Sequence, residues 1–333
     1  QVLCHDITQI IPGVTKDAVF RKGHIIREED IPVLLSVGKD SVYIWENDET
    51  MMHENDAAEV LYRMTANEHM HPSDVKEGKI EAIADTEGLL KVDREKLKKV
   101  NAFGEMMIAT RHGNTVVKKG DKLAGTRIIP LVIKKDKMQK AEKICDGTPI
   151  LKILPFTVKK AAIITTGNEV YHGRIKDAFT PVIEQKIAEF GAEMMFHEIF
   201  DDNDRKITDG CLRAIEAGAD IVFCTGGMSV DPDDKTPLAI KNTGAEMISY
   251  GSPVLPGAMF LLSYYRKGDK VIPICGLPGC AMYNRRTIFD LVLPRLMAAD
   301  PVTADELASL GEGGLCLNCK VCTFPNCGFG KGW

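Results

Sequence analysis

The chain has 333 residues, of which 44% are hydrophobic and 27% charged, so it is long enough for about two domains with cores of their own. Its formal net charge of −5 provides no field that would attract nucleic acid or a membrane surface, and no apolar run approaches the ~20 residues that span a bilayer. Because the N-terminus shows no signal-peptide pattern, we expect a cytoplasmic protein that binds neither nucleic acid nor membranes.

Residues 1–155 are expected to form a β-rich or α+β module. Short apolar stretches separated by turn residues predict strands at 88–93, 105–110, 114–117 and 128–133, and the apolar spacing of residues 57–64 predicts a helix. We place the domain boundary near the charged run Lys134–Lys143 or just after it, before residue 156.

Residues 156–300 alternate between strands and helices. Apolar runs predict strands at 160–166, 193–200, 219–224 and 271–275, and amphipathic spacing predicts helices at 181–190, 204–217, 235–242 and about 280–297. This order predicts an α/β domain with three αβα layers around a mostly parallel sheet. In such sheets, ligands bind beyond the carboxyl ends of the strands.

Three polar segments follow predicted strands: Thr165-Thr-Gly-Asn-Glu169, Thr225-Gly-Gly-Met-Ser229 and Gly276-Leu-Pro-Gly279. Parallel strands end at one edge of a sheet, so we expect these segments to form one anion-binding site. Backbone N–H groups in glycine-rich turns bind phosphates, and glycine lets the main chain approach a ligand closely. Candidate Mg²⁺ ligands follow the second segment, namely Asp231, Asp233 and Asp234. The alternative is a tight turn whose aspartates cap a helix.

Taken together, the three segments resemble the molybdopterin-binding domain of the MoeA/gephyrin-type molybdenum-insertion proteins. The resemblance covers residues 158–297, includes Asp201-Asp-Asn203, and is thinner over residues 1–45. It implies a protein of molybdenum or tungsten cofactor biosynthesis that binds molybdopterin as a small-molecule pterin or nucleotide ligand. It also implies insertion of molybdate into adenylated molybdopterin, and a homo-oligomer. The implied catalytic residues are Asp234, Glu169 and Asp177. The implied cofactor-binding residues are Thr166, Gly167, Asn168, Thr225, Gly226, Gly227, Ser229, Gly276, Pro278 and Gly279.

Two departures from the family pattern keep other functions open. Asn168 stands where the family has Asp, and Val254-Leu-Pro-Gly-Ala258 replaces a K-P-G-K stretch, so a carboxylate and both lysines are missing. These changes favour a non-catalytic molybdopterin carrier or sensor, whereas Asp234 favours an enzyme. A further alternative is a nucleotide pyrophosphatase of the CinA type. Thr225-Gly-Gly followed by Asp233-Asp-Lys-Thr236 resembles that family, in which paired carboxylates carry a metal that activates water.

Residues 301–333 are expected to form a separate tail with four cysteines in the spacing C-x₂-C-x₂-C-x₄-C: Cys316, Cys319, Cys322 and Cys327. Four thiolates bind either Zn²⁺ or a [4Fe–4S] cluster, and the spacing approaches the bacterial ferredoxin run without matching it. An iron–sulfur tail would suit delivery of electrons or cofactor to a molybdoenzyme. The alternative is a flexible tail with reactive thiols or disulfides.

Overall fold

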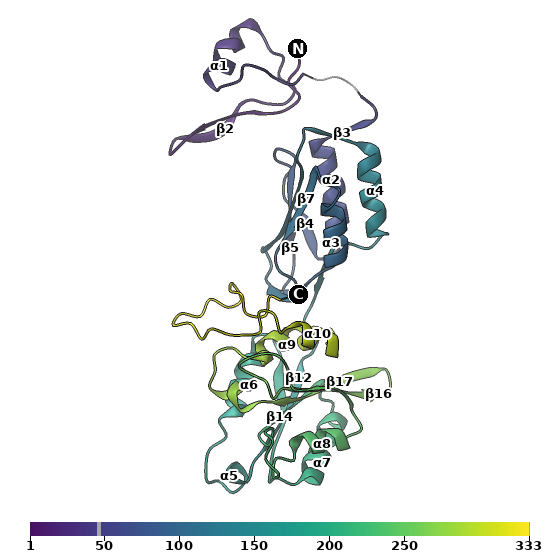
Figure 1. The fold of residues 1–333 in the computed structure, drawn as a ribbon, viewed down its shortest axis with the longest axis vertical. Coiled ribbons are helices and arrows are strands. Elements are labelled where there is room, and N and C mark those ends of the chain that lie inside the picture. Colours follow the sequence, from purple (N-terminus) through teal and green to yellow (C-terminus); the bar gives the residue numbers. More distant parts are fainter. Residues whose placement is uncertain (45–47, 333) are drawn as a thin grey trace. The chain divides into compact units, whose positions relative to one another are not determined.

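The computed structural model describes residues 1–44 and 48–332, which form two compact units. Unit 1 contains the described residues of the ranges 1–86, 91–111 and 118–153, and unit 2 contains residues 87–90, 112–117 and 154–332. Figure 1 shows the elements of both units, coloured from purple at the N-terminus to yellow at the C-terminus.

Unit 1 begins with a hairpin and a short helical segment. Strand β1 (Ile7–Ile11) pairs antiparallel with β2 (Thr15–Phe20). The 3₁₀ turn η1 (Glu28–Asp30) leads into helix α1 (Ile31–Ser36). The buried side chains Leu3, Ile7 and Leu34 pack together, so this part of the chain has a small core of its own.

The rest of unit 1 is built on a four-stranded antiparallel sheet in the order β4-β5-β9-β7. Its strands are β4 (Met70–Pro72), β5 (Lys79–Ala84), β7 (Met106–Thr110) and β9 (Lys122–Ile128). Helix α2 (Glu54–Thr65) contacts β5 and β9, and α3 (Arg94–Asn101) contacts β7. Strand β3 (Met51–His53) pairs with β10 (Val132–Lys134). The β-rich N-terminal module is therefore confirmed.

Helix α4 (Lys135–Cys145) occupies the charged run in which we placed the domain boundary. Met138, Ala141 and Cys145 are buried at three- and four-residue spacing, while most of the lysines are exposed. That spacing is the signature of one helical face packed on a core. Strand β11 (Leu151–Leu154) follows α4 and leads the chain into unit 2.

Unit 2 is built on a six-stranded sheet in the order β13-β12-β14-β17-β16-β15. The strands are β12 (Lys160–Thr166), β13 (Glu193–Phe200), β14 (Ile221–Thr225), β15 (Glu246–Tyr250), β16 (Leu261–Lys267) and β17 (Lys270–Leu277). The first four in this order run parallel, whereas β16 runs antiparallel to both of its neighbours, β17 and β15. This confirms the predicted mostly parallel sheet, to which β15 and β16 add an edge that we did not predict. A separate pair also belongs to unit 2, in which β6 (Gly88–Val92) meets β8 (Thr115–Val117) through residues 88–90.

Helices cover both faces of this sheet. Ile163 of β12 packs in one core with residues of α6 (Phe179–Ala188) and α9 (Ile288–Met297). The next residue, Ile164, packs in a second core with residues of α7 (Asp204–Glu216) and α8 (Thr236–Asn242). Successive strand side chains point to opposite faces, so the two cores define three αβα layers, as predicted. Within residues 1–44 and 48–332, no helix combines the length and apolar composition of a membrane-spanning segment.

The predicted helix at 280–297 begins later than expected. Residues Gly279–Met282 form the 3₁₀ turn η2, and α9 starts after Thr287. The Thr287 side chain accepts a hydrogen bond from Phe289 N, and Asp290 accepts one from Thr287 N at 2.8 Å. This capping box fixes the start of α9 and leaves residues 283–287 irregular.

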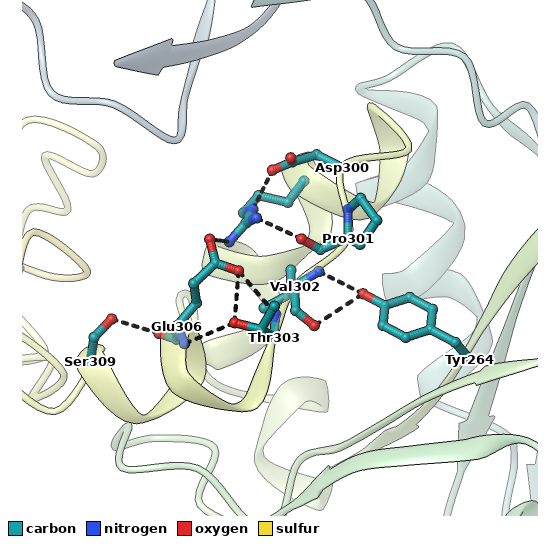
Figure 2. A network of polar contacts seen from close by, with 8 residues as sticks. Tyr264, Asp300, Pro301, Val302, Thr303, Glu306 and Ser309 are labelled. Atoms are coloured by element: carbon teal, nitrogen blue, oxygen red, sulfur yellow. Dashed lines mark hydrogen bonds and ion pairs between the residues drawn. The ribbon is translucent and has the colours of Figure 1, made fainter. Parts of the chain in front are cut away.

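Residues 301–332, which we predicted as a separate tail, pack on unit 2. Val302, Leu307 and Phe329 are buried in the same core as α9, and the segment contains helix α10 (Ala304–Ser309). Figure 2 shows the polar contacts that fix its beginning: Val302 N donates to the Tyr264 hydroxyl at 2.7 Å. Buried Arg295 of α9 pairs with Glu306 of α10 at 2.8 Å and with Asp300.

Candidate cofactor-binding site

The three predicted segments follow three neighbouring parallel strands of unit 2. In the sheet register Thr165 of β12 lies opposite Thr225 of β14, which lies opposite Leu277 of β17. The strands therefore end level with one another, at the carboxyl edge where ligands bind in sheets of this kind.

The first two segments are in direct contact. Thr166 Oγ1 donates to the Thr225 carbonyl oxygen at 3.1 Å, so the neighbouring Thr236 hydroxyl, 3.0 Å away, is the donor to Thr166. Gly226 has a φ of +81°, and a Cβ at this position would lie 2.1 Å from the Thr166 carbonyl oxygen. The close approach of the two turns thus requires glycine at position 226.

The second and third segments meet through Met228. This side chain is buried, and a Cβ on Gly276 would lie 2.5 Å from its sulfur and its methyl group. The Tyr250 hydroxyl of β15 donates to the Met228 carbonyl oxygen at 3.1 Å. Gly279, in contrast, is exposed, and a Cβ added to it would meet no atom of the described residues within 4 Å. The contacts therefore join the three segments up to Gly276 and leave Gly279 outside them.

One buried hydroxyl at this edge lacks a partner. Thr225 is 0% exposed, and its Oγ1 makes no hydrogen bond to any residue that the structure describes. Leaving a buried hydroxyl unpaired costs about 1–3 kcal/mol, so an unpaired group of this kind calls for an explanation such as a ligand or an ordered water. Thr225 lies opposite Thr165 in the sheet register, so its side chain points to the same face of the sheet as that of Thr165.

The aspartates after the second segment do not converge. Asp231 and Asp233 are exposed, whereas Asp234 turns back and its Oδ2 accepts a hydrogen bond from Ser229 N at 2.7 Å. Among the described residues there is no group of three or more histidine, cysteine, aspartate or glutamate side chains placed to hold a metal ion. The structure therefore gives no support to the predicted Mg²⁺ trio. Asp234 instead braces the loop from Ser229 to Asp234, because its carboxylate offers an acceptor to a loop N–H group.

A further carboxylate, Asp202, joins Glu169 and Asp234 at this edge. Asp202 Oδ2 accepts a hydrogen bond from Asn168 N at 3.1 Å. Burial raises the pKa of Asp202, and the negative charges of Glu169, Asp234 and Asp201 raise it further. We did not include Asp202 in the predicted site, although the Asp201-Asp-Asn203 signal was visible in the sequence.

Asp177 bonds to β12 on the face of the sheet opposite to the one on which Thr166 meets Thr236. Its Oδ2 accepts hydrogen bonds from the hydroxyls of Thr165 at 2.9 Å and Thr180 at 2.6 Å, and its Oδ1 accepts from Phe179 N and Thr180 N. Burial by itself would raise the pKa of Asp177, but these hydrogen bonds hold it below its usual range. Thr165 and Thr166 are successive strand residues, so Asp177 and Thr236 bind opposite faces of β12. Asp177 thus fastens α6 to β12.

The loop that lacks the family's lysines binds the C-terminal segment instead. Leu255 N donates to Gly314 O at 2.8 Å, and Cys316 N donates to Leu255 O at 2.8 Å. These bonds form a parallel bridge between Leu255 and Leu315. The residues just before the cysteine cluster are therefore held on residues 254–258.

The four clustered cysteines are free thiols that line one cavity of about 250 Å³. Cys319 and Cys322 are exposed, and Cys316 and Cys327 are half-buried. In the ranges that the structure describes, no three of them stand together as ligands of one ion, so the structure does not support the predicted Zn²⁺ or [4Fe–4S] site. We refer to the space lined by Cys316, Cys319, Cys322 and Cys327 as the cysteine cavity.

Comparison with known protein families decides the nature of unit 2. Residues 162–298 match the model of a family described as "probable molybdopterin binding domain". Unit 2 contains a domain of this family. The molybdopterin-binding-family domain, residues 162–298, holds all three strand-end segments, and the predicted resemblance is confirmed. Residues 1–46 match the model of a domain of unknown function.

Several known proteins are similar to part of this chain. A "Putative competence-damage inducible protein" of Bacillus cereus (strain B4264) is 30% identical over 129 residues, which cover 39% of this chain and 30% of that protein. The chain thus spans under a third of that relative's length. The structure of the tungsten cofactor synthesizing protein MoaB from Pyrococcus furiosus has 18% identity and a TM-score of 0.36, over 43% of this chain and 98% of that one. The structure of the protein CinA from Thermoplasma acidophilum has 17% identity and a TM-score of 0.34, over 42% of this chain and 98% of that one.

Proposed function

We propose that unit 2 binds molybdopterin or its adenylated form at the edge formed by the three strand-end segments, as a protein of molybdenum or tungsten cofactor biosynthesis. One observation carries this proposal: the three strand-end segments follow parallel strands that end level with one another, and the buried hydroxyl of Thr225 at this edge has no partner among the described residues. The match of residues 162–298 to a molybdopterin-binding family supports the choice of ligand.

In this proposal the turn atoms bind the phosphate of the ligand. Gly226 and Gly227 bring the main chain to the edge without a side chain, and the hydroxyls of Thr225 and Ser229 donate hydrogen bonds. Thr166 is already engaged by Thr225 and Thr236, so its role is to hold the two turns together. The remaining residues of the proposed binding edge are Gly167, Asn168, Gly276, Pro278 and Gly279.

A more specific proposal is that unit 2 inserts molybdate into the bound molybdopterin. Its catalytic candidates are Glu169 and Asp234. We add Asp202, because the charges of Glu169 and Asp234 raise its pKa. The predicted Mg²⁺ ligands diverge, so the geometry supports no step through that ion. A carrier or sensor that binds without turnover needs the same three turns and no metal.

A nucleotide pyrophosphatase of the CinA type is the second candidate. The similarity to competence-damage inducible proteins favours it, as does the Asp233-Asp-Lys-Thr236 stretch, in which Thr236 bonds to Thr166. Hydrolysis of a nucleotide pyrophosphate by the purified chain, abolished in Asp234→Ala, would promote this candidate over the first.

The proposal is tested by replacing the unpaired hydroxyl. Thr225→Val keeps the shape of the side chain and removes no hydrogen bond within the described protein, so its free energy of unfolding should stay within about 0.5 kcal/mol of the wild type. Its affinity for molybdopterin, measured by equilibrium titration without oxygen, should fall about tenfold.

Thr208→Val is the matched control. The Thr208 hydroxyl lies 2.7 Å from Asp204 O and 2.9 Å from Ala239 O, away from the three turns, and donates its one proton to these acceptors. This variant should therefore lose about 1 kcal/mol of stability and bind the ligand normally. Equal affinity of Thr225→Val and the wild type would contradict the proposal.

A homo-oligomer and a molybdoenzyme partner remain parts of the proposal. Light scattering of the purified chain checks the first, and co-purification with a molybdoenzyme checks the second.

A further inference from the structure

The four-stranded sheet of unit 1 has a hollow on the face that turns away from α2 and α3. On β5, Ile80 and Ala82 are buried, and the side chains that alternate with them point to the other face. Two of these, Lys79 and Glu81, join residues of β7 and β9 in lining a cavity of about 400 Å³. A cavity of this volume is large enough for a small organic ligand. We refer to it as the sheet cavity.

A glycine in the middle of a central strand forms the floor of the sheet cavity. Gly125 of β9 pairs with Glu81 of β5 on one side and with Ala109 of β7 on the other, and the register of β5 against β9 shifts only after Ala82. A Cβ at position 125 would meet only Lys79 Cε, at 3.6 Å, which is ordinary contact. Neither crowding nor a left-handed φ therefore requires glycine here. Glycine weakens the interior of a strand, and one typical reason for its presence is close approach of a ligand to the backbone.

Positive charge predominates around the sheet cavity. Its charged lining residues are four cations and one carboxylate, namely Lys79, Arg111, Lys122, Arg127 and Glu81. Lys79 and Lys122 both pair with Glu81, each at 2.6 Å. Arg111 pairs with Asp121, which is not a lining residue, at 2.7 Å. The excess of cations favours an anionic ligand.

Arg127 is the lining cation that has no carboxylate partner among the described residues. It is half-buried, and its Nε donates to Ile128 O at 3.1 Å, which leaves the N–H groups of both terminal nitrogens for another acceptor. These N–H groups are arranged to bind two oxygens of one phosphate. Arg127 and Gly125 are two residues apart on β9 and share a face, so their side-chain positions are ~6.6 Å apart. A molecule whose anionic group binds Arg127 can therefore extend over Gly125.

We propose that the sheet cavity binds a small organic phosphate, with its phosphate on the Arg127 guanidinium and a flat ring on Gly125 and Ala109. A phosphate monoester carries about 1.5 to 2 negative charges at pH 7, which suits a lining with more cations than carboxylates. Gly125 has no side chain and Ala109 only a methyl group, so the floor across these two strands is flat. Met107, which also lines the cavity, offers the ring an apolar and polarisable contact.

This inference does not depend on the proposed function. Every lining residue of the sheet cavity belongs to unit 1, whereas the strand-end segments belong to unit 2. The probes are also different, because the test uses no pterin.

The first test is isothermal titration of the full chain at low salt with three probes: AMP, inorganic phosphate and adenosine. AMP has both the phosphate and the flat ring, so it should bind at least about tenfold more tightly than either of the others. Arg127→Gln should weaken the binding of AMP about tenfold, because the charged donors to the phosphate are lost. Lys119→Gln is the matched control. It removes one positive charge from an exposed residue outside the cavity and should change the affinity less than about twofold.

The second test fills the floor of the cavity. Gly125→Val should fold, because the added side chain begins in open space and valine favours strands. Its affinity for AMP should fall about tenfold, because the ring loses its place, while its affinity for inorganic phosphate stays that of the wild type. Retained phosphate binding also shows that this variant is folded.

Three results would overturn the inference. The first is no binding of AMP by the wild type, and the second is equal affinity for AMP in Gly125→Val and the wild type. The third is loss of AMP binding in Thr225→Val but not in Arg127→Gln, which would place the nucleotide at the strand-end segments of unit 2.

Discussion

The acidic segment Asp231–Asp234 and the cysteine segment Cys316–Cys327 pose the same question, because each places potential metal ligands close together in the sequence. In the acidic segment two carboxylates point into solvent and the third binds Ser229 N. In the cysteine segment all four thiols line one cavity that Pro256, Arg286 and Phe329 help to close. Close spacing in the sequence therefore brings side chains to one space only where other parts of the fold line it, and in neither segment do the described residues form a metal site.

The largest expected effect concerns the backbone that supports the acidic segment. Gly226→Ala places a Cβ 2.1 Å from the Thr166 carbonyl oxygen, so the two turns must separate, and we expect a loss of about 3 kcal/mol in the free energy of unfolding. Gly268→Ala is the matched control, since Gly268 also has a positive φ but no atom within 4 Å among the described residues. It should cost about 1 kcal/mol. Urea unfolding gives both values, and equal losses would show that the turns are not in contact.

The three aspartates should contribute differently to the free energy of unfolding if only Asp234 stabilises the loop. Asp234→Ala removes the acceptor of Ser229 N and should cost about 1 kcal/mol, whereas Asp231→Ala and Asp233→Ala should change stability by less than about 0.5 kcal/mol. Adding Mg²⁺ should leave the Tm of all four proteins unchanged. Stabilisation by Mg²⁺ that disappears in each of the three variants would restore the predicted trio.

The smallest expected effect is the pH dependence due to Asp202. Burial and the charges of Glu169 and Asp234 raise its pKa in the folded state, so the folded chain binds the Asp202 proton more tightly than the unfolded chain. Its contribution to stability is present below the ordinary aspartate pKa of about 4 and is lost as pH rises through the raised folded value. Asp202→Asn should therefore gain stability over the wild type as pH rises through that window. A stability difference that does not change with pH would show that Asp202 is not repelled by its neighbours.

Much of the architecture of unit 2 could be predicted from the sequence, because strand–helix alternation and glycine-containing turns are local signals. The order of Thr165, Thr225 and Leu277 across one edge follows from parallel pairing. The start of α9 could also have been predicted, because Thr287 and Asp290 have the spacing of a capping box, a signal that we did not use.

Other features depend on contacts that the sequence does not reveal. The Thr225 hydroxyl is buried without a partner among the described residues, whereas the hydroxyl of Thr165, its neighbour in the register, bonds to Asp177, and the sequence does not distinguish the two. Asp177 and Asp234 are both loop aspartates. Asp177 accepts hydrogen bonds from the hydroxyls of Thr165 and Thr180, whereas Asp234 accepts one from Ser229 N. The cysteine cavity likewise requires Pro256 and Arg286, which are distant in sequence from Cys316.

The most direct test of the central claim is mass spectrometry of the small molecule released from the full chain purified without oxygen. The proposed function predicts free or adenylated molybdopterin in the wild type and a much lower amount in Thr225→Val. Release of a nucleotide pyrophosphate in place of a pterin, or equal pterin content in both proteins, would contradict it.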